Sequence, residues 1–77
     1  MKRVEILRAI EEAASLPGGT LKGDEALSAI GNWDSLTGSE FRLIVVDRWQ
    51  VSLSGAALPR CTTVADIVDL LGSRVED

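Results

Sequence analysis

The chain has 77 residues, of which 45% are apolar and 26% charged, so it has room for one small hydrophobic core in a single domain. It contains no histidine and one cysteine, Cys61, which excludes catalytic pairs built on imidazole, internal disulfides and multi-cysteine zinc sites. The net charge of −4 makes nucleic acid a poor partner, because an acidic surface repels phosphate backbones.

The first helix is predicted before Pro17, where apolar residues recur at steps of three and four. Its apolar face consists of Val4, Ile6, Leu7, Ile10, Ala13 and Ala14. The charged residues between them, Glu11 and Glu12 included, are expected to face solvent. Pro17, Gly18 and Gly19 end the helix, because none of them continues a helix well.

No apolar run approaches the ~18 residues of a membrane-spanning helix. Glu5 precedes any apolar stretch, which does not fit a signal peptide. We therefore expect a cytoplasmic protein that does not insert into membranes.

Residues 17–33 form a long connection, and long connections in small domains are usually functional or locally ordered. Asp24 is a suitable N-cap for one or two helical turns that end near Ile30. The acidic pair Asp24-Glu25 is expected to be solvated. The apolar anchors of the connection are expected to be Leu21, Leu27 and Ile30.

A second helix is predicted to start within Trp33-Asp34-Ser35-Leu36, where Asp34 is a good N-cap whose charge favours the positive end of the helix dipole. One apolar stripe of this helix is expected to fill the core: Phe41, Ile44, Val45 and Trp49. It is expected to pack against residues of the two other long helices: Leu7, Ile10, Ile67 and Leu71.

A second apolar stripe, offset from the first, consists of Leu36, Leu43 and Val46. Either the helix is buried nearly all round, or this strip is left exposed for a partner. Glu40 and Asp47 flank the strip, which favours the partner.

Beyond Trp49 the helical pattern breaks, and residues 50–55 are predicted to form an extended loop. Ser54 is a suitable cap for a short turn over residues 56–58, stopped by Pro59.

The last helix is predicted to start after Thr63, an N-cap with Asp66 three residues on in an arrangement close to a capping box. Its buried stripe is Val64, Ile67, Val68 and Leu71, and Gly72 ends it. Cys61 is interpreted as a small buried hydrophobe rather than a reactive thiol. Three main helices and one or two short ones predict a small all-α bundle.

Ser35 is the residue in the chain best placed for modification. It follows an N-cap at the end of a long loop, so a phosphate ester there would meet unpaired N–H groups and the positive end of the helix dipole. From position alone, an ordinary polar residue of a first helical turn is the more common interpretation.

The motif Asp34-Ser35-Leu36, after a long loop and with Glu40 five residues beyond Ser35, resembles the Asp-Ser-Leu motif of acyl carrier proteins and their peptidyl relatives. The similarity continues through Trp49 and a short helix near residues 54–58 to Thr62-Thr63-Val64. It implies one carrier domain over residues 1–77. The fold implied is a small four-helix bundle with three main helices, a short third helix and a long loop after the first helix.

The resemblance also implies a function. Ser35 would carry a 4′-phosphopantetheine arm that a phosphopantetheinyl transferase adds from coenzyme A, and the thiol of the arm would hold an acyl or aminoacyl thioester. The protein itself would be no enzyme but a monomer that serves loading enzymes and downstream synthases. Its recognition face for these partners would comprise Asp34, Leu36, Glu40, Leu43, Val46 and Asp47.

The chain departs from fatty-acid carriers in its second helix, where Arg42 and Arg48 interrupt an otherwise acidic pattern and Val46 replaces a typical acid. Gly38 lowers the propensity of this helix by up to ~1 kcal/mol relative to alanine. With Trp33 before the motif, these features favour a discrete carrier of polyketide, nonribosomal peptide or specialised lipid biosynthesis, with a domain of a larger synthase as the alternative.

Two alternatives remain open. An unmodified helical adaptor would share the fold and the apolar strip but would not need the Ser35 hydroxyl. A small enzyme using Ser35 or Cys61 as nucleophile is disfavoured, because the chain has no histidine to activate either side chain.

Overall fold

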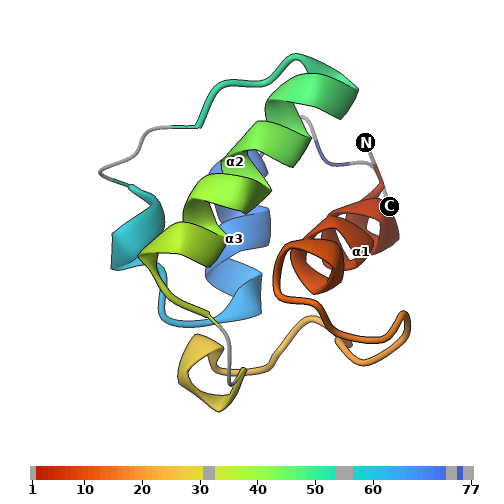
Figure 1. Cartoon of the computed structure of the whole chain (residues 1–77), viewed down its shortest axis with the longest axis vertical. Helices are drawn as coiled ribbons and strands as arrows, with labels where there is room; N and C mark the ends of the chain where they lie inside the picture. Colours follow the sequence, from red (N-terminus) through yellow and green to blue (C-terminus); the bar gives the residue numbers. More distant parts are fainter. Residues whose placement is uncertain (1, 31–32, 54–56, 73–74, 76–77) are drawn as a thin grey trace.

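Three α-helices carry the fold in the computed structural model, which describes residues 2–30, 33–53, 57–72 and 75: α1 (Arg3–Ala13), α2 (Ser35–Trp49) and α3 (Val64–Leu71). Two short 3₁₀ turns, η1 (Leu27–Ala29) and η2 (Leu58–Arg60), lie in the connections. In Figure 1, α2 crosses in front of α3, α1 lies on one side of this pair and η2 on the other. The prediction of a small all-α fold is confirmed.

The core lies between the three helices. Phe41 and Val45 of α2 are completely buried, and the predicted companions of this stripe, Ile44 and Trp49, are half-buried and pack against the core. The contributing residues of α1 and α3 include Ile6, Leu7, Ile10, Val64, Ile67 and Leu71. The predicted single core, with residues from all three helices, is therefore confirmed.

Two residues of α1 differ from the prediction. Val4, placed on the apolar face, is 48% exposed, because it lies ~120° around the helix from Ile10 at 3.6 residues per turn. Glu11, placed on the solvent face, is 1% exposed. The segment after α1 folds back over Glu11, so its carboxylate accepts hydrogen bonds from the Leu21 N–H at 2.8 Å and from Arg8 Nη1 at 2.6 Å.

Burial works against ionisation of Glu11, but hydrogen bonds from Leu21, Arg8 and Gly19 outweigh it and hold the pKa of this carboxyl below its ordinary value. Glu11→Gln is expected to lower the free energy of unfolding by about 1–3 kcal/mol at neutral pH, because the buried Leu21 N–H and the Arg8 guanidinium group lose a charged acceptor. The pKa of the Glu11 carboxyl is lower in the folded protein than in the unfolded chain, so wild type loses this stabilisation as the pH falls below about 4 and the carboxyl is protonated. The free energies of unfolding of wild type and Glu11→Gln therefore converge at low pH.

Urea unfolding of Glu11→Gln and wild type from pH 7 to pH 3 measures this convergence. Glu12→Gln is the matched control, because Glu12 is exposed and pairs with the exposed Arg48. It should change stability by no more than about 0.5 kcal/mol. A constant difference between Glu11→Gln and wild type at every pH would contradict the role given to the Glu11 carboxylate.

The part of the connection between α1 and α2 up to Ile30 is held by its own contacts. Leu21, Leu27 and Ile30 are buried, as predicted. Asp24 was expected to cap a helical turn, and this was wrong, because η1 begins after Ala26. The Glu25 side chain instead accepts hydrogen bonds from the N–H groups of residues 22 and 23, so it is not simply solvated.

The same connection is joined to the start of α3. An isolated antiparallel bridge pairs Ala26 with Thr63. The Leu27 N–H donates to the Thr62 carbonyl and the Val64 N–H donates to the Glu25 carbonyl, each at 2.9 Å. The backbone before η1 is therefore held extended, which leaves no helical turn for Asp24 to cap.

The elements after α2 follow the prediction in part. The described part of the expected loop, residues 50–53, is irregular and buries Val51 and Leu53. Pro59 lies inside η2 and does not stop a turn before it, since the first positions of a helical turn need no N–H donor. The predicted cap Ser54 lies outside the described residues.

The predicted start of α3 is confirmed. Thr63 Oγ1 accepts a hydrogen bond from the Asp66 N–H at 3.1 Å, and the Asp66 carboxylate accepts one from the Thr63 N–H at 3.1 Å. In the described part of the chain, no helix is long and apolar enough to cross a membrane.

Candidate functional site

The start of α2 is fixed by its cap. Asp34 has an extended backbone, and its Oδ1 accepts a hydrogen bond from the Thr37 N–H at 2.9 Å. Hydrogen bonds from the backbone and side chain of Thr37 hold the pKa of Asp34 below its ordinary value, so it stays ionised at neutral pH. Ser35 is the first residue of α2, and it is exposed. The predicted N-cap is confirmed.

An open groove of about 340 Å³ lies beside Ser35, between the first half of α2 and η2. Its lining is Trp33, Asp34, Ser35, Gly38, Ser39, Arg42, Leu58, Pro59 and Cys61. A Cβ atom at Gly38 would lie 3.3 Å from Leu58 Cδ2, so the missing side chain lets η2 pack close against α2. The glycine that weakens the helix in isolation therefore shapes the groove.

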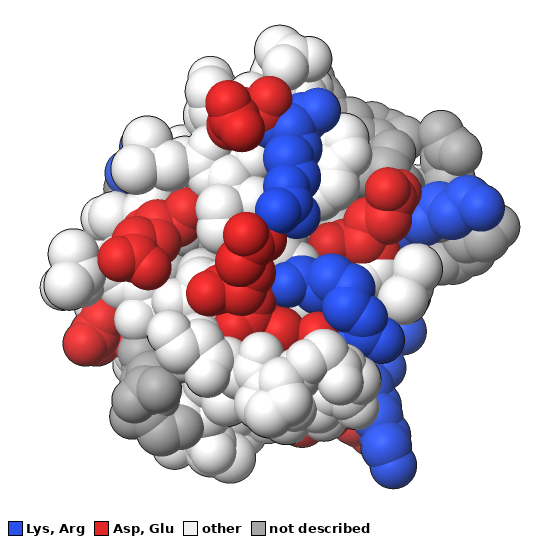
Figure 2. Space-filling model, turned by 45° about the vertical axis from the view of Figure 1, so that its right-hand side comes forward, with Lys and Arg blue, Asp and Glu red and all other residues white. Residues whose placement is uncertain are grey.

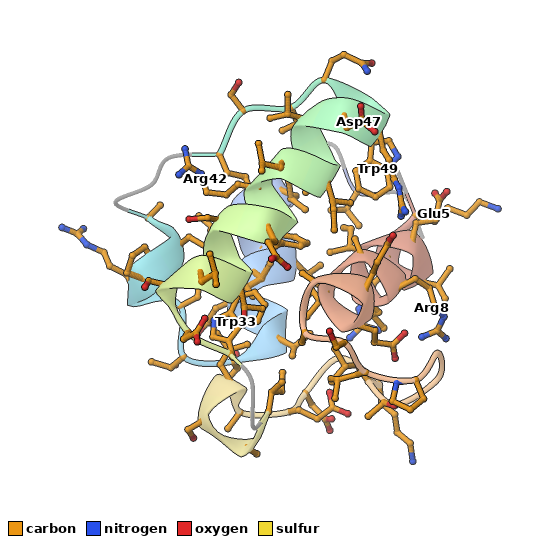
Figure 3. The ribbon with its side chains drawn as sticks, viewed as in Figure 1. Glu5, Arg8, Trp33, Arg42, Asp47 and Trp49 are labelled. Carbon is orange, nitrogen blue, oxygen red and sulfur yellow. The ribbon has the colours of Figure 1, made fainter. Side chains whose placement is uncertain are left out.

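Arg42 lines the groove on the side of α2 that faces η2, whereas Trp33 lies beside the start of the helix (Figure 3). Arg42 is half-buried, and its Nε donates a hydrogen bond to the Leu53 carbonyl at 3.2 Å. Among the residues that the structure describes, no carboxylate forms an ion pair with Arg42. By contrast, Arg48 pairs with Glu12 and Arg8 pairs with Glu11.

Cys61 lines the same groove and is half-buried rather than fully buried. Burial and the nearby Asp66 carboxylate raise the pKa of its thiol. A raised pKa lowers the thiolate fraction, so Cys61 has the character of a small apolar residue. The described residues bring together no group of three acidic or cysteine side chains that could hold a metal ion.

The second apolar stripe of α2 lies on the surface. Leu36 is 68% exposed, Leu43 69% and Val46 44%. The alternative in which α2 is buried nearly all round is therefore wrong. We call Leu36, Leu43 and Val46 the apolar strip.

The apolar strip lies between charges of opposite sign. Glu40 and Asp47 are exposed, and Asp47 lines a shallow hollow with Leu43, Ile44 and Val46. A second hollow of about 260 Å³, toward the loop after α2, is lined by Ser39, Arg42, Leu43, Val46, Ser52 and Leu53. Partner-binding residues predicted from the sequence thus gather around one face of α2, whereas Asp34 lies at the groove with Ser35.

The surface toward α1 has a different character. Figure 2 brings this side forward and shows acidic and basic side chains interleaved rather than separated. One ion pair, between Arg8 and Glu11, lies within α1. Another, between Arg48 and Glu12, joins α2 to α1. The net negative charge is therefore not gathered into one acidic patch on this face.

Sequence reasoning missed the groove and the position of Arg42 in it. The groove depends on η2 packing against α2, a contact between distant segments that the helix pattern alone does not predict. Gly38 was the available signal, because a glycine inside a helical pattern often marks a close approach of another segment.

Comparison of the chain with protein-family models, with curated proteins and with solved structures found no match.

Proposed function

We propose that this chain is a carrier protein that accepts a 4′-phosphopantetheine arm on Ser35 and presents thioester-bound acyl or aminoacyl groups to partner enzymes. The observation that carries the proposal is the exposed Ser35 at the first position of α2, directly after the Asp34 cap and at the end of the long connection from α1. In this proposal η2 is the short third helix of a four-helix carrier fold. The carrier works as a cytoplasmic monomer in polyketide, nonribosomal peptide or specialised lipid biosynthesis.

The residues around Ser35 fit an attached phosphodiester. The backbone N–H groups of the first helical turn and the positive end of the α2 dipole favour a negative charge at this position. The groove gives a flexible arm a surface against which to lie, with apolar contacts from Leu58 and Pro59. When attached, the arm supplies the thiol that forms the thioester.

The attachment needs only a hydroxyl from this chain. The Ser35 oxygen forms a new bond to the phosphorus that carries pantetheine in coenzyme A. The bond from that phosphorus to the adenosine 3′,5′-bisphosphate leaving group breaks, and the hydroxyl proton passes to the transferase. Exposure of Ser35 leaves room for that second protein.

The test is intact-mass measurement after incubation with coenzyme A and several broad-specificity phosphopantetheinyl transferases. The expected result is a mass gain of one phosphopantetheine group per chain, located on Ser35 by peptide mapping. If no transferase modifies the folded protein, the carrier proposal fails and the unmodified adaptor, which needs only the apolar strip, takes its place.

The apolar strip is proposed as the docking surface for these partner enzymes. It runs along α2 from a residue adjacent to Ser35, so an enzyme bound there receives the arm. Exposed carboxylates at Glu40 and Asp47 favour encounter with basic-rimmed enzymes, and a few apolar contacts add modest burial. Binding should therefore be weak and salt-sensitive, as a carrier that visits several enzymes requires.

Leu43→Gln is expected to lower kcat/KM for phosphopantetheine transfer about tenfold or more, since a buried leucine contact contributes about 1.5–3 kcal/mol. The free energy of unfolding should change by no more than about 0.5 kcal/mol, because Leu43 is on the surface. Val4→Gln, which changes an exposed apolar residue on α1, is the control and should leave transfer unchanged. Equal transfer rates for the two variants would place the docking surface elsewhere.

A further inference from the structure

The groove beside Ser35 carries charge at both ends. Asp34 lies at the end where α2 starts, and its carboxylate is already engaged by the Thr37 N–H. Arg42 is seven residues beyond Ser35, a rise of about 10 Å along the helix axis. Between them the surface is largely apolar, with Trp33 and Leu58 among the lining residues.

The side chain of Arg42 is held in place by a hydrogen bond, and no carboxylate among the described residues pairs with it. Its Nε is fixed by the Leu53 carbonyl at 3.2 Å, which orients the guanidinium group and leaves the terminal nitrogens as donors. A guanidinium group binds a carboxylate through two parallel hydrogen bonds. Half-burial strengthens such a pair relative to one in open solvent.

We propose that this groove selects cargo that ends in a free carboxylate, which Arg42 binds, so that the carrier serves dicarboxylic acyl groups in preference to neutral acyl or aminoacyl groups. The inference rests on the proposed attachment at Ser35. A neutral acyl group leaves the guanidinium group without a partner, and the ammonium group of an aminoacyl cargo is repelled by it. The structure thereby favours acyl-chain assembly over peptide assembly among the candidate pathways.

The test loads the protein through a transferase with malonyl-, acetyl- or β-alanyl-coenzyme A and records ¹⁵N NMR spectra that include the Arg42 Nε–H. We expect the malonyl form to shift the Arg42 Nε–H and the Gly38 amide relative to the acetyl form. The β-alanyl form should show no such shift. An Arg42 signal that is the same with malonyl and acetyl cargo overturns the inference.

Variants assign the effect to the guanidinium group. Arg42→Gln should abolish the malonyl-specific shift at Gly38, and Arg42→Lys, which keeps the positive charge, should retain part of it. Arg60→Gln is the control, because Arg60 is an exposed arginine of η2 outside the groove lining. A malonyl-specific shift that survives in Arg42→Gln, or is lost in Arg60→Gln, overturns the assignment.

The two proposals fail in different ways. If Ser35 accepts none of the arms, the carrier function fails and the inference about cargo fails with it. If Ser35 accepts all three arms and Arg42 does not distinguish their cargo, only the selectivity inference fails.

Discussion

Ser35→Ala is expected to abolish phosphopantetheine attachment completely, so that its intact mass stays unchanged under conditions in which wild type gains one arm per chain. The reaction needs the hydroxyl oxygen of this residue to form the phosphodiester bond, and alanine has no such atom. Because Ser35 is exposed, the variant should remain folded, with a free energy of unfolding within about 0.5 kcal/mol of wild type.

Ser39→Ala is the matched control for this experiment. Ser39 lies one helical turn beyond Ser35 and lines the same groove, and its hydroxyl donates a hydrogen bond to the Ser35 carbonyl at 3.1 Å. It should be modified like wild type. Attachment to Ser35→Ala, or equal loss in both variants, would show that the hydroxyl at position 35 is not the acceptor.

Phe41→Ala is expected to cost about 3–5 kcal/mol of stability, because it removes a large side chain from a core that cannot fully close around the cavity. None of the Phe41 surface is exposed, and its ring lies 6.2 Å from that of Trp33, centroid to centroid. A domain of this size has about 4–12 kcal/mol of stability in total. The variant should therefore lose about a quarter or more of the stability of the domain, and its urea midpoint should fall in proportion.

Urea titration followed by circular dichroism measures this loss. Leu43→Ala removes an apolar side chain from the surface of the same helix and should shift stability by no more than about 0.5 kcal/mol. A Phe41→Ala midpoint close to that of wild type would contradict the assignment of Phe41 to the core.

Local signals were sufficient to predict most of the helical framework. Asp34 and Thr63 marked the starts of α2 and α3, because a capping side chain acts on N–H groups within its own first turn. The buried stripe around Phe41 was predicted for the same reason, since its helical period is a property of the α2 sequence alone.

Contacts between distant segments were not predictable in this way. Glu11 was assigned to solvent, since its burial depends on the Leu21 N–H, which lies beyond the end of α1. The same limit applies to the candidate site. The position of Ser35 followed from the helix pattern, and the acidic residues beside the apolar strip favoured the exposure of Leu43. The groove and the position of Arg42 in it depend on how η2 packs.

The bridge between Ala26 and Thr63 has a consequence for how the molecule fluctuates. The Leu27 and Val64 amides each donate across this bridge, so neither can exchange its hydrogen with solvent until the two segments separate. Separation also removes the backbone support at the start of α3, next to its capping residue. We therefore expect residues 25–27 and the start of α3 to open together as one cooperative unit.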